Sequence, residues 1–339
     1  MDSWRGGNLE PIKPGWKGFC EAVSGMPGAL ARVVAIQPIA GQTEGLLATV
    51  PDASTVAAPL VLSIQSQVIS GHVGNAPAAF ALQRLGFEVL ALPTVLLTHH
   101  PGHGSPAGRA LASTELAAHL DCLQGRGLLG NVAGLLTGYL GEPGNGAIAL
   151  DAWKMLKAAN PRALFLCDPV IGDRDGGIYV RPGLPEFFRD QAVAAANILT
   201  PNHFELEWLA GTPVLSIDQA LAAGERLLAR GPRLVVCTSL ITHDTPQDSI
   251  ETLAVAGDGA WLVRTPRLAQ PPHGSGDLFA ALLFAHLLQG VSPPAALARS
   301  VTAVYSVLKE SDGAPEMRLI ECQAVLARPP VAFTARRLR

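Results

Sequence analysis

From Pro59 onward, short apolar runs alternate with longer stretches whose apolar residues recur every three or four positions. The short runs predict strands at 60–65, 87–95, 163–170, 194–202 and 233–240. The longer stretches predict helices at 75–86, 113–125, 144–161, 203–211 and 218–231. Strands and helices therefore follow one another repeatedly, which is typical of a parallel sheet with helical crossovers.

The pattern changes after residue 250. Residues 251–265 contain two apolar runs joined by Gly-Asp-Gly, which predicts an antiparallel hairpin. Helices are predicted near 276–290 and 293–309, and a last one from about residue 315. Continuous apolar strands imply a sheet that is covered on both faces. We therefore predict an open three-layer α/β/α sandwich with a mostly parallel central sheet and an antiparallel edge.

The two ends of the chain differ from this middle. Residues 1–58 are rich in Gly and Pro and show no sustained period, so we expect a poorly structured N-terminal extension. Residues 59–330 are predicted to form the folded domain. Residues 331–339 end in Ala-Arg-Arg-Leu-Arg, which we interpret as a basic, solvated tail.

Composition narrows the functional classes. Hydrophobic residues make up 48% of the 339 residues, charged residues make up 16%, and the formal net charge is −3. Such a chain can build a large core but has no excess of positive charge for nucleic acid or an anionic membrane. The five cysteines show no CxxC spacing, and we see neither a signal peptide nor a membrane span. These features predict a cytoplasmic protein with reduced thiols.

Polar clusters follow several predicted strands, where functional loops of an open α/β sheet lie. A phosphate-handling enzyme fits these clusters. However, the sequence has no GxxxxGK[ST] motif, and none of its five lysines lies in a loop that follows a predicted strand. Gly274, Ser275 and Gly276 precede a long apolar helix, so their backbone N–H groups can meet an anion at the helix N-terminus. Asp277 lies in the first turn, where we expect the helix field to keep it ionised and available as a general base.

Four segments together resemble the pyridoxal kinases of the ribokinase-like superfamily. They are LSIQSQVISGHVGN from Leu60 onward, CDPVIGD, LTPNHFELEWLAG and GSGDLFAALL. The resemblance runs from Leu60 to the last helices, about four-fifths of the chain. The GxGD element marks the superfamily only, whereas the SIQS…GHVGN block is much more specific to vitamin B6 kinases.

This resemblance implies an ATP-dependent transfer of a phosphoryl group to the 5′-hydroxyl of pyridoxal. Asp277 would be the base and would also contact the substrate, and Gly274, Ser275 and Gly276 would form the anion hole. Ser66 would bind the pyridine ring. Asn202, Glu205, Thr238 and Ser239 would lie at the nucleotide, and Glu205 and Asp168 would bind Mg²⁺. The resemblance also implies a homodimer and leaves open a monovalent cation, K⁺ or Na⁺.

The chain departs from the family pattern in two places. It has HHPGHG where the family has NHTGYG or a similar run, so Pro101, followed by Gly102, replaces a substrate-contacting threonine. An aspartate expected near the nucleotide phosphates is replaced by Ala133. Neither change affects the predicted base or anion hole.

Several alternatives stay open. A hydroxymethylpyrimidine kinase shares the GxGD helix, and a vitamin B6-binding protein without catalysis would fit the changes at Pro101 and Ala133. Glu205 could cap its helix instead of binding a metal. His99, His100 and His103 suggest a metal site, but we interpret them as a flexible loop over the substrate, since no Cys or carboxylate lies beside them at ligand spacing.

Overall fold

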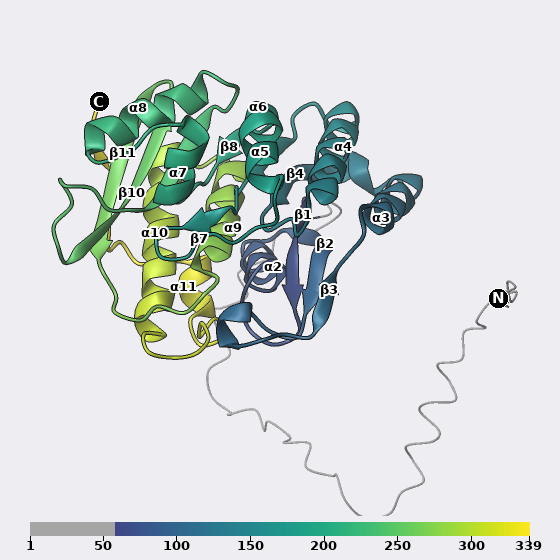
Figure 1. Ribbon diagram of the computed structural model, residues 1–339, viewed down its shortest axis with the longest axis horizontal. Coiled ribbons are helices and arrows are strands. Elements are labelled where there is room, and N and C mark those ends of the chain that lie inside the picture. The colour runs from purple at the N-terminus through teal and green to yellow at the C-terminus, as the bar shows by residue number, and fades with distance from the viewer. Residues whose placement is uncertain (1–57) are drawn as a thin grey trace, which may run out of the picture. The chain divides into compact units, whose positions relative to one another are not determined.

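The structure, a computed structural model, describes residues 58–339 (Figure 1). The predicted extension over residues 1–58 lies outside this range except for its last residue. A ten-stranded sheet runs through the domain in the order β12-β11-β10-β9-β8-β5-β4-β1-β2-β3. Its strands are β1 (Leu60–Val68), β2 (Glu88–Leu97), β3 (Gly108–Ala110), β4 (Val132–Thr137), β5 (Leu164–Cys167), β8 (Ile198–Leu199), β9 (Leu234–Leu240), β10 (Ser249–Ala256), β11 (Gly259–Pro266) and β12 (Arg336–Arg337).

The strand directions agree with the prediction. Strands β2, β1, β4, β5, β8 and β9 run parallel to one another. Strand β3 at one edge and strands β10, β11 and β12 at the other each pair antiparallel with the strand that precedes them in the chain. The mostly parallel sheet with an antiparallel edge is therefore confirmed. A separate two-stranded ribbon joins β6 (Gly172–Asp173) and β7 (Gly177–Ile178).

Helices cover both faces of the sheet and enclose two apolar cores (Figure 1). On one face lie α3 (Ser113–Gly125), α4 (Pro143–Ala159), α5 (Leu184–Phe187), α6 (Val193–Ala195), α7 (His203–Ala210) and α8 (Ile217–Leu228). On the other lie α2 (Asn75–Arg84), α9 (Ser275–Leu288), α10 (Pro293–Glu310) and α11 (Gln323–Ala327). The short helices η1 (Pro101–His103), η2 (Leu128–Asn131) and η3 (Phe188–Ala192) complete the fold. The three-layer sandwich is confirmed.

Strand β4 lies at the centre of the sheet, yet the hydrophobic pattern did not predict it. Its sequence, VAGLLT, contains Gly134 and follows Gly130, and such glycines argue against a strand. In the fold, a side chain on Gly134 would overlap the ring of Phe284 from α9. Close packing of α9 onto β4 therefore requires glycine at position 134, and this same glycine weakens the strand pattern in the sequence.

Helix α9 is buried on all sides from Leu278 to His286, as expected for a helix that is apolar all round. It packs between the sheet and its neighbours α2 and α10 (Figure 1), so its N-terminus is held rigidly at one end of the sheet. The last predicted helix is observed only as α11, and part of the predicted basic tail pairs with β11 as strand β12. No helix among residues 58–339 is both long and apolar enough to span a membrane.

Candidate active site

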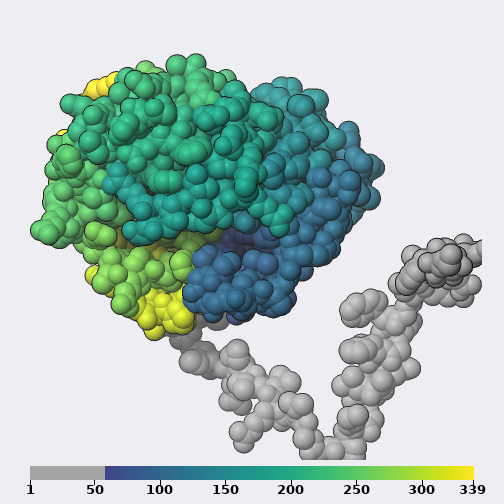
Figure 2. All heavy atoms as spheres, in the orientation of Figure 1, coloured from purple at the N-terminus to yellow at the C-terminus, as the bar shows by residue number. Residues whose placement is uncertain are grey.

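The carboxyl ends of the parallel strands meet the N-terminus of α9. Strands β1, β4, β5 and β8 are in register, so the residues that follow them lie side by side. The backbone N–H of Asp168, after β5, donates to the C=O of Thr137 at 2.9 Å. The Thr200 hydroxyl, after β8, donates to Asp168 Oδ1 at 3.0 Å. Figure 2 shows the surface hollowed where the blue, teal and yellow-green parts of the chain meet.

Asp277 lies in the first turn of α9 and faces the loop that follows β1. Its Oδ2 accepts a hydrogen bond of 2.8 Å from the backbone N–H of Gly74. Burial raises the pKa of Asp277 from 3.8 to about 6, although the hydrogen bond from Gly74 opposes this shift. We expected the helix field to keep Asp277 ionised, and burial acts on its pKa in the opposite direction. A carboxylate with a pKa near 6 is ionised at neutral pH and is suited to general-base work.

The residues before Asp277 form an uncapped helix N-terminus. No side chain caps α9, whose N-cap residue is Gly274, with a φ of 90°. A side chain on Gly274 would overlap the carbonyl of His72, whereas a methyl group on Gly276 would lie 3.9 Å from Asp168 Oδ2. The structure therefore brings Gly274, Ser275 and Gly276 together at an uncapped helix start, where N–H groups can meet an anion, with the Asp168 carboxylate beside Gly276.

Asp168 lies deep in the same site. Asp168 is 8% exposed, and burial raises the pKa of its carboxyl group well above the usual value. The charges of Glu205 and Asp277 raise it further, while the hydrogen bond from Thr200 opposes the shift. The charges of two further carboxylates therefore act on Asp168, and a bound cation would relieve this repulsion.

Glu205 has two kinds of partner. It is the third residue of α7 and forms a capping box with Asn202: its Oε2 accepts from the Asn202 backbone N–H at 2.8 Å, and the Asn202 Oδ1 accepts from the Glu205 N–H at 3.0 Å. The Ile171 N–H also donates to Glu205 Oε1 at 2.9 Å. Burial still raises the pKa of Glu205 to about 8. The Gly172 N–H donates to Oε1 as well, at 3.5 Å, whereas in the part of the chain that the structure describes Oε2 accepts from the Asn202 N–H alone. The capping role left open above is thus observed.

A magnesium site fits these carboxylates. Among residues 58–339, no group of three or more His, Cys, Asp or Glu side chains is arranged to hold a metal alone. Mg²⁺ in kinases is usually held by one or two carboxylates together with substrate phosphates. Asp168 and Glu205 are both buried, and the charge of Glu205 acts on Asp168. This pair could supply the two carboxylates that such a magnesium site needs.

Two predicted nucleotide residues end the neighbouring strand β9. Thr238 donates its backbone N–H to the C=O of Pro201 at 2.9 Å and bridges to Asn202, so it lies beside the start of α7. Ser239 follows with a φ of 52°, the only positive φ of a non-glycine residue in the described part of the chain. Strained backbone of this kind is concentrated at functional sites.

The predicted substrate residues gather on the other side of α9. Ser66 lies in β1 against Gly74, because a side chain on Gly74 would overlap the Ser66 hydroxyl. Pro101 and Gly102 form the start of η1, and a methyl group on Gly102 would lie 2.5 Å from His273 Nε2. The structure therefore brings both Ser66, through Gly74, and the loop with Pro101 and Gly102, through His273, close to the α9 N-terminus.

Ala133 is the exception. It is the second residue of β4, next to the pairing of Leu60 with Val132, and so lies at the amino end of that strand. The site lies beyond the carboxyl end, at Thr137, about 13 Å further along at ~3.3 Å per residue. Ala133 therefore lies away from the α9 site, unlike the place beside the nucleotide phosphates that the resemblance implied.

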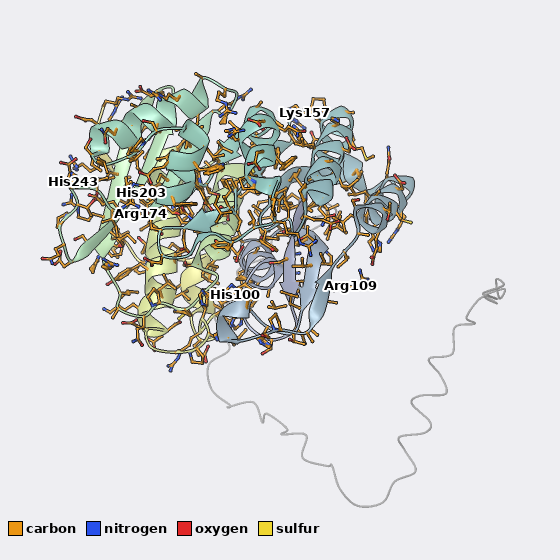
Figure 3. All side chains as sticks on the ribbon, viewed as in Figure 1. His100, Arg109, Lys157, Arg174, His203 and His243 are labelled. Carbon is orange, nitrogen blue, oxygen red and sulfur yellow. The ribbon has the colours of Figure 1, made fainter. Side chains whose placement is uncertain are left out.

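Histidines line the rim of the site. The rings of His100 and His273 lie 4.2 Å apart, and His103 lies 5.9 Å from His273. Burial and the neighbouring imidazoles lower the pKa of His100 to about 4. Figure 3 shows His100 at the edge of the domain near β3. These histidines join two loops, and among residues 58–339 they form no metal site.

Basic side chains are scarce at the site. Figure 3 places Lys157 on α4, away from α9, and shows Arg174 beside His203. The Arg174 guanidinium lies 2.9 Å from His203 Nε2 and 3.6 Å from Glu207. No lysine among residues 58–339 follows a strand, since the three present lie on α4 and α10.

Three residues of the site were not predicted individually: Gly74, Thr200 and Tyr179. Gly74 and Thr200 lie inside recognised segments, but only the fold shows that they contact Asp277 and Asp168. Tyr179 follows β7 and is 52% exposed, and burial together with the charges of Glu205, Asp173, Asp168 and Asp277 raises its pKa. No local signal separates these residues from ordinary loop positions.

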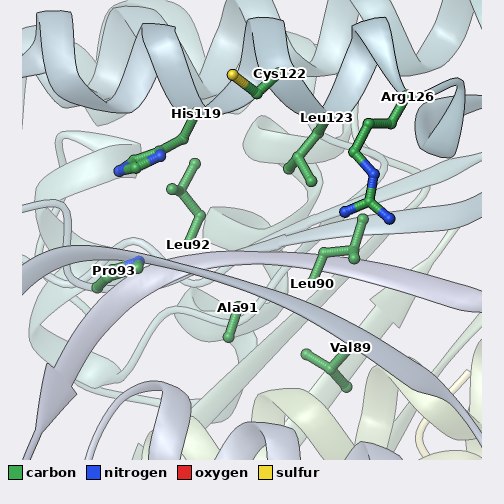
Figure 4. A pocket seen from close by; sticks show the side chains of 9 residues that line it. All are labelled: Val89, Leu90, Ala91, Leu92, Pro93, His119, Cys122, Leu123 and Arg126. Atoms are coloured by element: carbon green, nitrogen blue, oxygen red, sulfur yellow. The ribbon is translucent and has the colours of Figure 1, made fainter. Parts of the chain in front are cut away.

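A further pocket of about 450 Å³ lies between β2 and α3 (Figure 4). Its walls are mostly apolar, with His119, Cys122 and Arg126 on the helix side. None of the predicted site residues lines it, and it has no carboxylate. The chemistry therefore belongs to the α9 site.

Comparisons with known proteins agree with this geometry. Residues 137–317 match the family model described as phosphomethylpyrimidine kinase. The pyridoxal kinase PdxY of Rubrobacter xylanophilus is 46% identical over 281 residues, covering 82% of this chain and 97% of the relative. That of Deinococcus radiodurans is 44% identical over 286 residues, covering 82% and 96%. The pyridoxal kinase from Leishmania donovani in complex with ADP and pyridoxamine superposes with a TM-score of 0.78 at 27% identity, covering 83% of this chain and all of the other.

Proposed function

The chain belongs to the pyridoxal kinase family of ATP-dependent kinases, and we propose that its α9 site transfers the γ-phosphoryl group of ATP to the 5′-hydroxyl of pyridoxal. The observation that carries the proposal is the position of Asp277 at an uncapped helix N-terminus, hydrogen-bonded to the loop after β1. That position puts a base between the predicted substrate strand and the anion site.

The proposed chemistry follows from these groups. Asp277 removes the proton of the 5′-hydroxyl while that oxygen bonds to the γ-phosphorus, and the bond from phosphorus to the β,γ-bridging oxygen of ATP breaks. The products are pyridoxal 5′-phosphate and ADP. The N–H groups of Gly274, Ser275 and Gly276 stabilise the negative charge on the transferred group. Ser66 and the Pro101–Gly102 loop border the pyridine ring.

The nucleotide side is assigned to residues that follow β8 and to residues in the last part of β9. Asn202, Thr238 and Ser239 would border the phosphates of ATP, and Asp168 and Glu205 would hold Mg²⁺. When bound, this ion neutralises phosphate charge. A requirement for K⁺ or Na⁺, a homodimer and a cytoplasmic location remain predictions.

A second function has one observation in its favour. The family model that matches residues 137–317 is described as phosphomethylpyrimidine kinase, so a hydroxymethylpyrimidine is an alternative substrate. The alternative of a binding protein without catalysis rested on the changes at Pro101 and Ala133. Only Pro101 still favours it, because Ala133 lies away from the site.

An ADP-release assay distinguishes these functions. Pyridoxal, pyridoxine, pyridoxamine and hydroxymethylpyrimidine are each supplied with MgATP. We expect turnover with pyridoxal. Turnover with the pyrimidine alone would reject the proposal in favour of the second function, and calorimetric binding of pyridoxal without any ADP release would favour the binding protein.

The pH dependence of kcat/KM should report Asp277. A base works only when ionised, and the pKa of Asp277 is raised to about 6. We therefore expect kcat/KM for pyridoxal to fall about tenfold for each pH unit below 6 and to level off above it. Steady-state rates between pH 4.5 and 8 measure this. An acidic limb centred near the ordinary value of 3.8 would contradict the predicted environment of the base.

Replacing Glu205 by glutamine should separate its two roles. If Glu205 binds Mg²⁺, we expect Glu205→Gln to raise the Mg²⁺ concentration for half-maximal turnover about 10- to 100-fold. If it only caps α7, the melting temperature should change and the Mg²⁺ requirement should not. Mg²⁺ titrations at saturating ATP, with thermal melts of both proteins, decide between the two roles.

A further inference from the structure

The turn after α10, residues 311–317, contacts both loops that build the site. The backbone N–H of Gln270 donates to Asp312 Oδ1 at 2.9 Å, and the Gly313 N–H donates to the Gln270 C=O at 3.2 Å. Gln270 belongs to the loop that leads from β11 to Gly274. The backbone N–H of His72, in the loop after β1, donates to Glu316 Oε2 at 3.0 Å. One turn therefore holds the anion-site loop and the substrate-side loop together.

The carboxylate of Glu316 fills a place that the neighbouring loops leave for it. A methyl group on Gly71, whose φ is 104°, would lie 2.5 Å from Glu316 Oε1. His103 Nε2 lies 3.2 Å from the same oxygen, so the carboxylate also contacts η1. Glu316 thus joins three segments that are distant in sequence.

The turn itself is firmly fixed. The Ser311 hydroxyl is buried, donates to the Val307 C=O at 2.6 Å and accepts from the Arg318 N–H at 2.9 Å. Met317 is 1% exposed, and its methyl group would lie 2.9 Å from a side chain on Gly274. Because both flanks of Glu316 are anchored, its side chain can act as a fixed acceptor.

A short path leads from Glu316 to the base. His72, whose N–H is held by Glu316, is two residues from Gly74, whose N–H donates to Asp277 Oδ2 at 2.8 Å. The carbonyl of His72 lies against Gly274, so the segment has no room to move toward α9. We infer that Glu316 is a positioning residue for phosphoryl transfer, which holds the segment from His72 to Gly74 so that Gly74 orients Asp277.

This inference rests on the proposed function, and its test compares kcat with KM. In Glu316→Ala we expect kcat to fall about 10- to 100-fold, the effect of displacing a reacting group by about 1 Å. The KM for MgATP should stay within about twofold, because the nucleotide side is not touched. Glu316→Gln keeps an acceptor of the same length and should restore most of the activity. Glu321→Ala removes an exposed carboxylate five residues further on and should match the wild type.

The outcomes separate this inference from the proposed function. A wild-type enzyme without turnover would reject the function, whereas an active wild type with an unchanged Glu316→Ala would reject the inference alone. A general loss of folding would lower kcat in proportion to the folded fraction and leave KM unchanged, so thermal melts of both proteins give the folded fraction at the assay temperature. A fall in kcat no larger than the loss of folded protein would also reject the inference. If Glu316→Ala does not fold, Glu316→Asp decides: its shorter side chain should lower kcat without raising the KM for MgATP, and unaltered kinetics would reject the inference.

Discussion

Asp277→Asn is expected to lower kcat by ~10²–10⁴, because it removes the group proposed to accept the proton of the attacking hydroxyl. The asparagine carbonyl can still accept the hydrogen bond from Gly74, so the substrate side of the site should be preserved. Steady-state ADP release gives kcat, and calorimetry gives the affinity for pyridoxal, which should change little.

The stability of this variant gives a second readout. The pKa of Asp277 in the folded protein, about 6, lies above its ordinary value of 3.8. The folded state therefore favours the protonated form, and the ionised group lowers the free energy of unfolding as the pH rises from about 4 through 6. Asp277→Asn should consequently melt at the same or a higher temperature at pH 7.

Asp121→Asn provides the matched control. It makes the same change of charge on the exposed surface of α3, and both activity and melting temperature should stay at wild-type values. Near-normal turnover in Asp277→Asn would remove general-base catalysis by this residue from the mechanism.

Gly274→Val is expected to lower kcat by at least ~10²–10³, the usual effect of losing one anion-hole donor. The φ of 90° at this position is unfavourable for a β-branched residue, and its side chain would overlap the carbonyl of His72. Relief of that overlap must move either the N–H groups at the start of α9 or the segment that holds Asp277. We also expect a loss of about 1–3 kcal/mol in the free energy of unfolding.

Gly290→Val separates backbone strain from damage to the site. Gly290 follows the other end of α9 with a φ of 78°, and no atom lies within 4 Å of an added side chain. This control should lose stability through backbone strain while kcat stays near the wild-type value. If both variants lose activity equally, strain in α9 and not the anion site explains the result.

The sequence predicted the frame of the molecule well, because apolar periodicity reports which faces are buried. Strand β4 escaped because Gly134, required by the ring of Phe284, interrupts the apolar pattern. Ala133 was assigned through the resemblance alone, and only the bounds of β4 show that it lies at the amino end of that strand.

The individual contacts of the site could not be predicted, because they join segments far apart in the chain. Gly74 and Asp277 are 203 residues apart, and His72 and Glu316 are 244 apart. The pKa of Asp277 depends on burial, which a first-turn carboxylate does not reveal in sequence. The capping box of Asn202 and Glu205 was different, because its partners are three residues apart and local spacing suggests it.

The uncapped start of α9 has a consequence for how such a site can change. Its attraction for anions comes from peptide groups, which carry the same dipoles whatever amino acids are present. Mutations can therefore hardly adjust this attraction by exchanging one functional group for another, as they could with an amine or a guanidinium. Mutations can only change the backbone conformation at the start of α9, and most such changes would also disturb the packing of α9 in the core.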